Sequence, residues 1–252
     1  MSETVQTSQP EKTSPFKSIL TLFLRPRLFF AEQANGWGLP MLVLSLTLTI
    51  QTAVAGYFRA RAAAMGEVPL PPDWQWWSPE MQNNYMQAQQ ATQGPVFVYI
   101  IPLVGALSGL WLGWLLVSGL MHLASTLLGG RGTMSTALGV VAWASLPLAL
   151  REVLRVVFML AAGRAIASPG LSGFISGEGG MIFASQLLGL VDLFFVWYAV
   201  LAVIGFSVKD NLSNRKAAIG VIGVLVLILL AQAGLGVLGQ NLGGMLISRP
   251  FF

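Results

Sequence analysis

The chain has 252 residues, of which 55% are hydrophobic and 10% are charged, and its formal net charge is +4. About a quarter of the residues of an average soluble domain are charged, so this composition argues against cytosolic, nucleic-acid-binding and disordered proteins and predicts an integral membrane protein. The chain lacks cysteine and has one histidine, His122, which excludes disulfides, thiolate chemistry and multi-histidine metal sites. No cofactor is therefore expected.

The N-terminal part divides into a polar tail and a short amphipathic segment. Residues 1–14 are rich in Ser, Thr and Gln and are predicted to be disordered, and a membrane domain is predicted over residues 15–245. Residues 15–30 are too short to span a bilayer and are interrupted by Pro26. Their basic residues stand beside Ile, Leu and Phe, which favours a helix in the membrane interface, in one piece or two. Packing of this helix against the bundle is the alternative, and both can hold at once.

Five stretches are long and apolar enough to cross a bilayer, which takes about 20 apolar residues. They cover residues 37–58, 98–124, 135–158, 183–208 and 217–239. The third stretch contains ionisable residues inside its apolar run, and Pro147 is expected to kink it. The predicted fold class is therefore all-α integral membrane: a bundle of five transmembrane helices with an N-terminal amphipathic interfacial helix.

The distribution of basic residues predicts the orientation. If the N-terminus is cytoplasmic, eight of the 14 Lys and Arg residues lie in cytoplasmic segments, four lie outside and two lie in the third span. An excess of Lys and Arg on the cytoplasmic side is the bias that membrane proteins show. Because the number of spans is odd, the C-terminus is then extracytoplasmic.

Residues 59–94 are predicted to form an extracytoplasmic loop that contains a short helix. The Ser-Pro-Glu sequence at residues 78–80 supplies an N-cap, a proline at the first helical position and an acidic first turn. Three tryptophans, Trp74, Trp76 and Trp77, precede this helix and fit an interfacial aromatic belt. A tryptophan cluster can also bind sugars or protein partners, and this alternative stays open.

Glycines recur every four residues in the second span, at Gly105, Gly109 and Gly113. Four residues advance a helix by about 40° beyond a full turn, so the three glycines lie along one smooth face. Small residues let helix backbones approach closely in lipid. The series therefore predicts helix packing, and it does not tell whether the partner helix belongs to this chain or to another.

A second group of glycines, Gly129, Gly130 and Gly132, follows the second span. The group lacks the lysine and the hydroxyl of a phosphate-binding loop. It is predicted to form a tight cytoplasmic turn in which the glycines take positive φ.

Four ionisable residues fall within or beside the apolar runs of the spans: Arg151, Glu152, Arg155 and Asp192. Such groups are costly in a bilayer and often mark a functional pathway. A rise of about 1.5 Å per residue puts Arg151 about 22 Å and Asp192 about 24 Å from the cytoplasmic face. These similar depths predict an Arg151–Asp192 ion pair near the outer interface, with Arg155 reaching water. An ion or proton pathway through the same residues is the alternative.

Enzyme motifs are incomplete. A Gly-x-Ser-Gly sequence at residues 170–173 matches the pattern of rhomboid-type serine proteases, but that chemistry needs a histidine from a later span, and His122 comes earlier. Intramembrane aspartyl proteases need two facing aspartates, and the predicted spans contain only Asp192. No catalytic residues are therefore expected.

Several short motifs follow one another in a recognisable order. They are an amphipathic lead-in at residues 16–26, Gly-Trp-Gly at 36–38, the glycine turn at 128–132 followed by the segment 140–147, and the Val-Asp-Leu-Phe-Phe-Val-Trp segment at 191–197, followed by Ile-Gly-Phe at 204–206, Ser213 and Lys-Ala at 216–217. In this order they resemble the Yip family, the Ypt/Rab-interacting membrane proteins, in its shorter bacterial form.

The resemblance implies five spans and a non-enzymatic scaffold or adaptor of a bacterial inner membrane, which packs against and helps to assemble or regulate another membrane protein complex, such as an export system. Eukaryotic members are associated with Rab-type GTPases through a sizeable cytoplasmic N-terminal region. Here only about 35 residues precede the first span, so a Rab-type partner is not expected. The expected partners are the lipid bilayer and another integral membrane protein, and not nucleic acid. The alternative function is a small ion or solute transporter that uses the four intramembrane charges.

Overall fold

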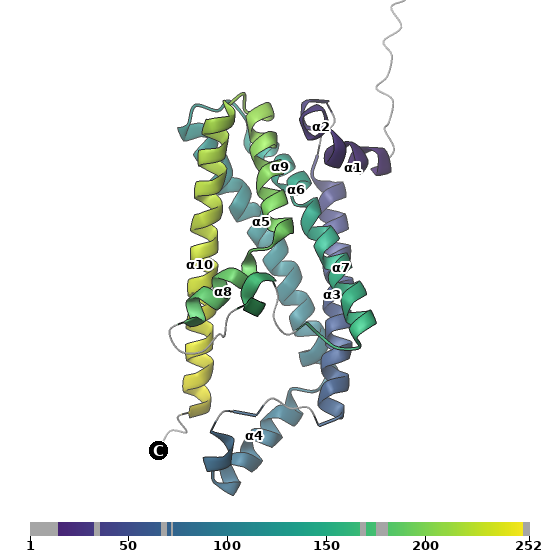
Figure 1. The fold of residues 1–252 in the computed structure, drawn as a ribbon, viewed down its shortest axis with the longest axis vertical. Coiled ribbons are helices and arrows are strands. Elements are labelled where there is room, and N and C mark those ends of the chain that lie inside the picture. Colours follow the sequence, from purple (N-terminus) through teal and green to yellow (C-terminus); the bar gives the residue numbers. More distant parts are fainter. Residues whose placement is uncertain are drawn as a thin grey trace, which may run out of the picture.

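The computed structural model describes residues 15–32, 36–66, 70–71, 73–166, 170–174 and 181–248. Within these ranges every regular element is helical (Figure 1). The α-helices are α1 (Pro15–Leu24), α2 (Pro26–Glu32), α3 (Gly38–Ala64), α4 (Pro79–Ala91), α5 (Ile101–Leu127), α6 (Met134–Ala144), α7 (Leu146–Ala162), α8 (Ile182–Leu190), α9 (Leu193–Lys209) and α10 (Asn214–Ser248). Short helical turns stand at η1 (Trp74–Trp76), η2 (Val96–Ile100) and η3 (Gly170–Phe174). The predicted tail, residues 1–14, lies outside the described residues.

Four helical segments are long and apolar enough to cross a membrane: Gly38–Ala64, Val96–Leu127, Met134–Ala162 and Asn214–Leu238. They correspond to the first, second, third and fifth predicted spans. Helices α8 and α9 qualify together as a further crossing, but they are bent by 59° at the break between them. The all-helical membrane architecture is confirmed, and the count of five holds if α8 and α9 form one bent span.

The predicted span at residues 183–208 is not one continuous helix. Helix α8 ends at Leu190, and both Val191 and Asp192 have extended backbone conformations. The Asp192 side chain then caps α9, because its Oδ1 accepts a hydrogen bond from the Phe195 backbone N–H at 2.9 Å. Aspartate is a strong N-cap because its carboxylate satisfies a free amide of the first turn, and here it starts a new helix within an apolar run.

The third span is interrupted only briefly, at Ser145, where α6 gives way to α7. Pro147 stands in the first turn of α7, a position at which its missing N–H leaves no hydrogen bond broken. The span ends at Ala162, beyond the predicted end near residue 158, and Gly163 follows it in the left-handed conformation with φ of 68°. A glycine in this conformation is a common helix terminator.

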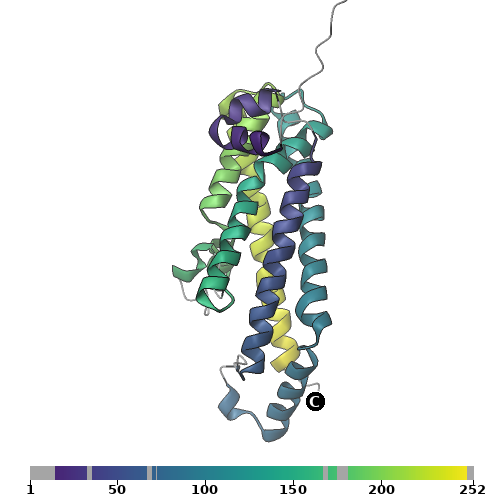
Figure 2. The same cartoon turned by 90° about the vertical axis from the view of Figure 1, so that its right-hand side faces the viewer.

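Helices α1 and α2 lie at one end of the bundle, beside the α5–α6 and α9–α10 turns (Figures 1 and 2). Phe29 and Phe30 of α2 are completely buried, and the Phe29 ring meets the Trp143 ring edge-on with centroids 4.8 Å apart. A Cβ atom at Gly205 would lie 3.1 Å from the Phe30 ring, so a glycine in α9 lets α2 approach. The amphipathic segment therefore packs against the bundle, as one of its two readings predicts.

The loop helix α4 lies at the opposite end of the molecule from α1 and α2 (Figure 1). Its predicted cap is confirmed, since the Ser78 hydroxyl accepts a backbone hydrogen bond from the first turn at 3.3 Å. Trp74 and Trp77 pack against Tyr85, with ring centroids 5.4 and 5.7 Å away. The Trp76 side chain is instead 80% exposed.

Candidate functional site

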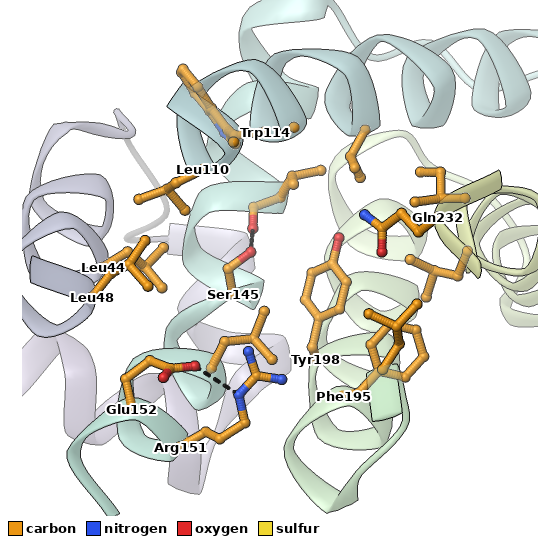
Figure 3. Close-up of a pocket in the computed structure, with 18 of the residues that line it drawn as sticks. Leu44, Leu48, Leu110, Trp114, Ser145, Arg151, Glu152, Phe195, Tyr198 and Gln232 are labelled. Carbon is orange, nitrogen blue, oxygen red and sulfur yellow. Dashed lines mark hydrogen bonds and ion pairs between the residues drawn. The ribbon is translucent and has the colours of Figure 1, made fainter. Parts of the chain in front are cut away.

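A cavity of about 320 Å³ lies among α3, α5, α6, α7, α9 and α10, which carry the candidate membrane spans (Figure 3). Its walls are mostly aliphatic and aromatic, with Leu44 and Leu48 from α3, Leu110 and Trp114 from α5, and Phe195 from α9. Leu190, the last residue of α8, also lines it. The break between α8 and α9 therefore lies at the edge of this cavity, where irregular backbone is tolerated inside a membrane protein.

A few polar side chains line the cavity. Tyr198 and Gln232 stand on the wall formed by α9 and α10, while Arg151 and Glu152 lie together on α7 (Figure 3). The Ser145 hydroxyl also reaches the cavity, but it is already hydrogen-bonded to the Val141 carbonyl oxygen at 2.7 Å. An apolar space with a few polar groups is typical of a small-molecule or lipid site.

The four intramembrane charges form one cluster, which we call the charge quartet: Arg151, Glu152, Arg155 and Asp192. Arg151 Nη1 lies 3.4 Å from Asp192 Oδ2, which is the ion pair that equal membrane depths predict. Arg151 Nε lies 2.9 Å from Glu152 Oε1, and Arg155 Nη1 lies 3.2 Å from the same oxygen. The two positive and two negative charges balance, so the quartet is neutral as a unit.

Local sequence spacing explains how the quartet forms. Arg151 and Arg155 stand four residues apart on α7 and project from the same side of the helix. Glu152 lies between them and is buried, whereas the side chains of both arginines keep 22–23% of their surface exposed. The capping role of Asp192 fixes its carboxylate at the start of α9, within reach of α7. The cap and the ion pair therefore reinforce one another.

The predicted packing glycines, Gly105, Gly109 and Gly113, are not in close contact with another helix in the described part of the chain. A Cβ atom built at any of the three would meet nothing within 4 Å among those residues. Gly109 and Gly113 instead line the cavity. We call these three residues the glycine strip. Close packing of another described helix on this strip is therefore absent.

A second polar cluster, at the α1–α2 end, has no counterpart in the sequence predictions. Asp210 directly follows α9 and is 1% exposed, and its Oδ2 accepts a hydrogen bond from the Ser125 hydroxyl of α5. Its Oδ1 has no hydrogen-bond partner among the described residues. Burial raises the pKa of the Asp210 carboxyl, while the Ser125 hydrogen bond and the nearby His122 oppose that rise. The carboxylate thereby links the α9–α10 turn to α5.

The glycine turn closes over this carboxylate. Gly129 has the predicted positive φ, 90°, but the prediction is wrong for Gly130 and Gly132, which are glycines for steric reasons. A Cβ atom at Gly130 would lie 2.9 Å from the Ser125 carbonyl oxygen, and one at Gly132 would collide with the Asp210 carboxylate. In the sequence, two glycines in a short turn after a span indicate that another group approaches the turn closely. The sequence does not reveal that this group is the Asp210 carboxylate.

Composition, helical spans and an intramembrane cavity define a multi-pass α-helical membrane protein. The family model for the Yip1 domain matches residues 20–235, which is most of the chain. The protein therefore belongs to the Yip1 domain family, as the order of its sequence motifs predicts. No curated protein and no solved structure matches the chain.

Proposed function

We propose that the protein is a non-enzymatic membrane adaptor, and that the glycine strip of α5 binds a transmembrane helix of another integral membrane protein. The observation that carries the proposal is the uncovered state of this strip. In the apolar 18-residue window of the span Val96–Leu127 only 6% of the residues are buried, against 61% in the corresponding window of the span Met134–Ala162. The second span is therefore the least covered of the four, and it carries the residues best suited to close helix contact.

Another glycine of this chain shows what close packing looks like. A Cβ atom at Gly205 of α9 would collide with Val140 and lie 3.1 Å from the Phe30 ring, whereas one at any glycine of the strip would meet nothing within 4 Å among the described residues. Without side chains in the way, a partner helix can approach until backbones touch, and dispersion contacts then replace contacts with lipid. The partner that fits is a membrane-spanning helix with its own small residues, from a complex such as an export system.

We place the protein in a bacterial inner membrane with its N-terminus in the cytoplasm, in line with the excess of basic residues on that side. The exposed Leu20, Leu24 and Leu28 of α1 and α2 would then face lipid at the cytoplasmic interface, while Phe29 and Phe30 hold the segment to the bundle.

A transporter is the second candidate, and the break between α8 and α9 favours it. Broken helices at a cavity are a common feature of transporter binding sites. Against this function, the quartet charges pair with one another instead of facing an ion path. The buried residues Phe30, Trp143 and Phe206 also fill the bundle between the cavity and the α1–α2 end.

The experiment is a pull-down of the full-length protein from its native membrane in mild detergent, followed by mass spectrometry. We expect one stoichiometric membrane partner with the wild type and its loss with Gly109→Leu. Gly223→Leu in α10 is the matched control, because Gly223 also has open space around it but lies outside the strip. Equal recovery of the partner with both variants, or no partner with the wild type, would contradict the adaptor function.

A further inference from the structure

We propose that the cavity binds one phospholipid with a zwitterionic headgroup that carries a phosphate and an ammonium. One acyl chain would fill the cavity, and the headgroup would lie on the charge quartet. This inference does not rest on the adaptor function, because it concerns the protein without a partner. Gly109 and Gly113 belong both to the cavity lining and to the glycine strip, so a bound partner helix and the acyl chain would compete for this face. It assigns to the quartet a role as a lipid-headgroup site.

The depth of the quartet in the membrane suits a headgroup. Helix α9 has 17 residues between the Asp192 cap and its end at Lys209, which is a length of about 25 Å. This is nearly the hydrocarbon thickness of a bilayer, about 30 Å. If α9 ends at one membrane face, Asp192 lies close to the other, at the level where headgroups meet acyl chains. The 59° bend turns α8 away from the direction of α9 at this level.

The cavity lies on the hydrocarbon side of the quartet. Arg151 and Glu152 stand at its edge, while Tyr198 follows Asp192 by six residues along α9, or about 9 Å towards the other face. An unfilled space of this size with mostly apolar walls would forfeit the dispersion contacts of those walls. Water finds polar partners at the few polar side chains, such as Tyr198 and Gln232, but not along the leucine walls. The bilayer itself supplies a filler with the right chemistry, an acyl chain.

The charges of the quartet determine which headgroup fits. A purely anionic headgroup would draw the guanidinium groups away from Glu152 and Asp192 and leave carboxylates without partners, which is costly in a low-dielectric site. A zwitterionic headgroup brings one group of each sign, so its phosphate can take guanidinium donors while its ammonium takes carboxylate oxygens. The guanidinium groups have the capacity for this, because each offers five N–H donors and both side chains are partly exposed.

The test uses full-length protein purified in mild detergent and reconstituted in bilayer nanodiscs that contain equal amounts of phosphatidylethanolamine and phosphatidylglycerol. Native mass spectrometry after release from the nanodisc counts the retained lipids. We expect one phosphatidylethanolamine per protein. Leu148→Trp would fill the cavity from α7 and should lower this retention at least about tenfold. Leu150→Trp is the matched control, because Leu150 is 40% exposed and lies outside the cavity lining.

The headgroup assignment is tested by the neutral double variant Arg151→Gln with Asp192→Asn. It should abolish the preference for phosphatidylethanolamine, whereas Arg61→Gln in α3 should preserve it. Thermal unfolding of each variant checks that it is folded. No retained lipid, unchanged retention with Leu148→Trp, or a preference for phosphatidylglycerol would each overturn the proposal. Because no partner protein is present, these results are independent of the pull-down.

Discussion

Asp192→Asn is the perturbation that tests the quartet most directly. Asparagine is isosteric with aspartate and is an equally good N-cap, so the hydrogen bond to the Phe195 N–H can persist. The variant therefore removes the charge and little else. It leaves Arg151 and Arg155 with Glu152 as the single carboxylate, and the quartet gains a net positive charge.

The size of the effect follows from burial and from distance. Removing one partner of a fully buried ion pair costs about 3–5 kcal/mol, whereas exposed pairs contribute about 0–1 kcal/mol. Here the contacts from Asp192 Oδ2 are 3.4 Å to Arg151 and 4.0 Å to Arg155, and the arginine side chains are 22–23% exposed. We therefore expect a loss of about 1–2 kcal/mol, between these limits.

The assay is thermal unfolding in one detergent at one pH. A loss of 1 kcal/mol lowers the melting temperature of a protein of this size by about 2–4 °C, so Asp192→Asn should lower it by about 2–8 °C. The double variant with Arg151→Gln is neutral and should be more stable than Asp192→Asn alone. Asp73→Asn, at an exposed carboxylate, is the control. A single variant as stable as wild type, or a double variant less stable than the single one, would refute the structural role of the pair.

Three further predictions concern the α1–α2 end and the topology. Gly132→Ala should destabilise the protein by about 1–3 kcal/mol, because the added methyl displaces the buried Asp210 carboxylate; thermal unfolding measures this, and unchanged stability would contradict the contact. The raised pKa of Asp210 means that the folded protein holds this proton more tightly than the unfolded chain. Its contribution to stability should therefore grow as the pH falls from the raised pKa towards about 4, and Asp210→Asn should flatten this dependence; an identical pH profile in the variant would show that another group titrates. Reporter fusions at Ser2 and Phe252 should report opposite sides of the membrane, and the same side for both would mean an even number of spans.

Hydropathy predicted the spans because a window of about 20 residues averages over many side chains. The same averaging hid the break at Asp192, since one aspartate barely changes the mean of the apolar run from 183 to 208. The capping preference of aspartate was available in the sequence, but an aspartate can also stay inside a helix. The ion pair with α7 favours the break, and this contact joins residues that are far apart in the chain.

The Asp210 cluster escaped prediction for a different reason. Charged residues at the ends of spans are usually solvated, and a sequence does not show that Ser125 and the glycine turn cover this one. The glycine strip shows a different limit of prediction from sequence. Its spacing indicates a smooth helix face, but glycine spacing does not tell whether another helix lies against that face.

The two ends of the bundle differ in packing, and this difference bears on the adaptor function. At the α1–α2 end, buried aromatic residues such as Phe29, Phe30 and Phe206, together with the Asp210 link, leave little space between helices. Towards α8, the cavity, the uncovered glycine strip and the partly exposed quartet leave α5 supported mainly through its contacts with α3, α6 and α10. Local stability follows the density of buried contacts. A partner helix or a lipid chain would therefore act on the less packed half, while the other half holds the helices in register.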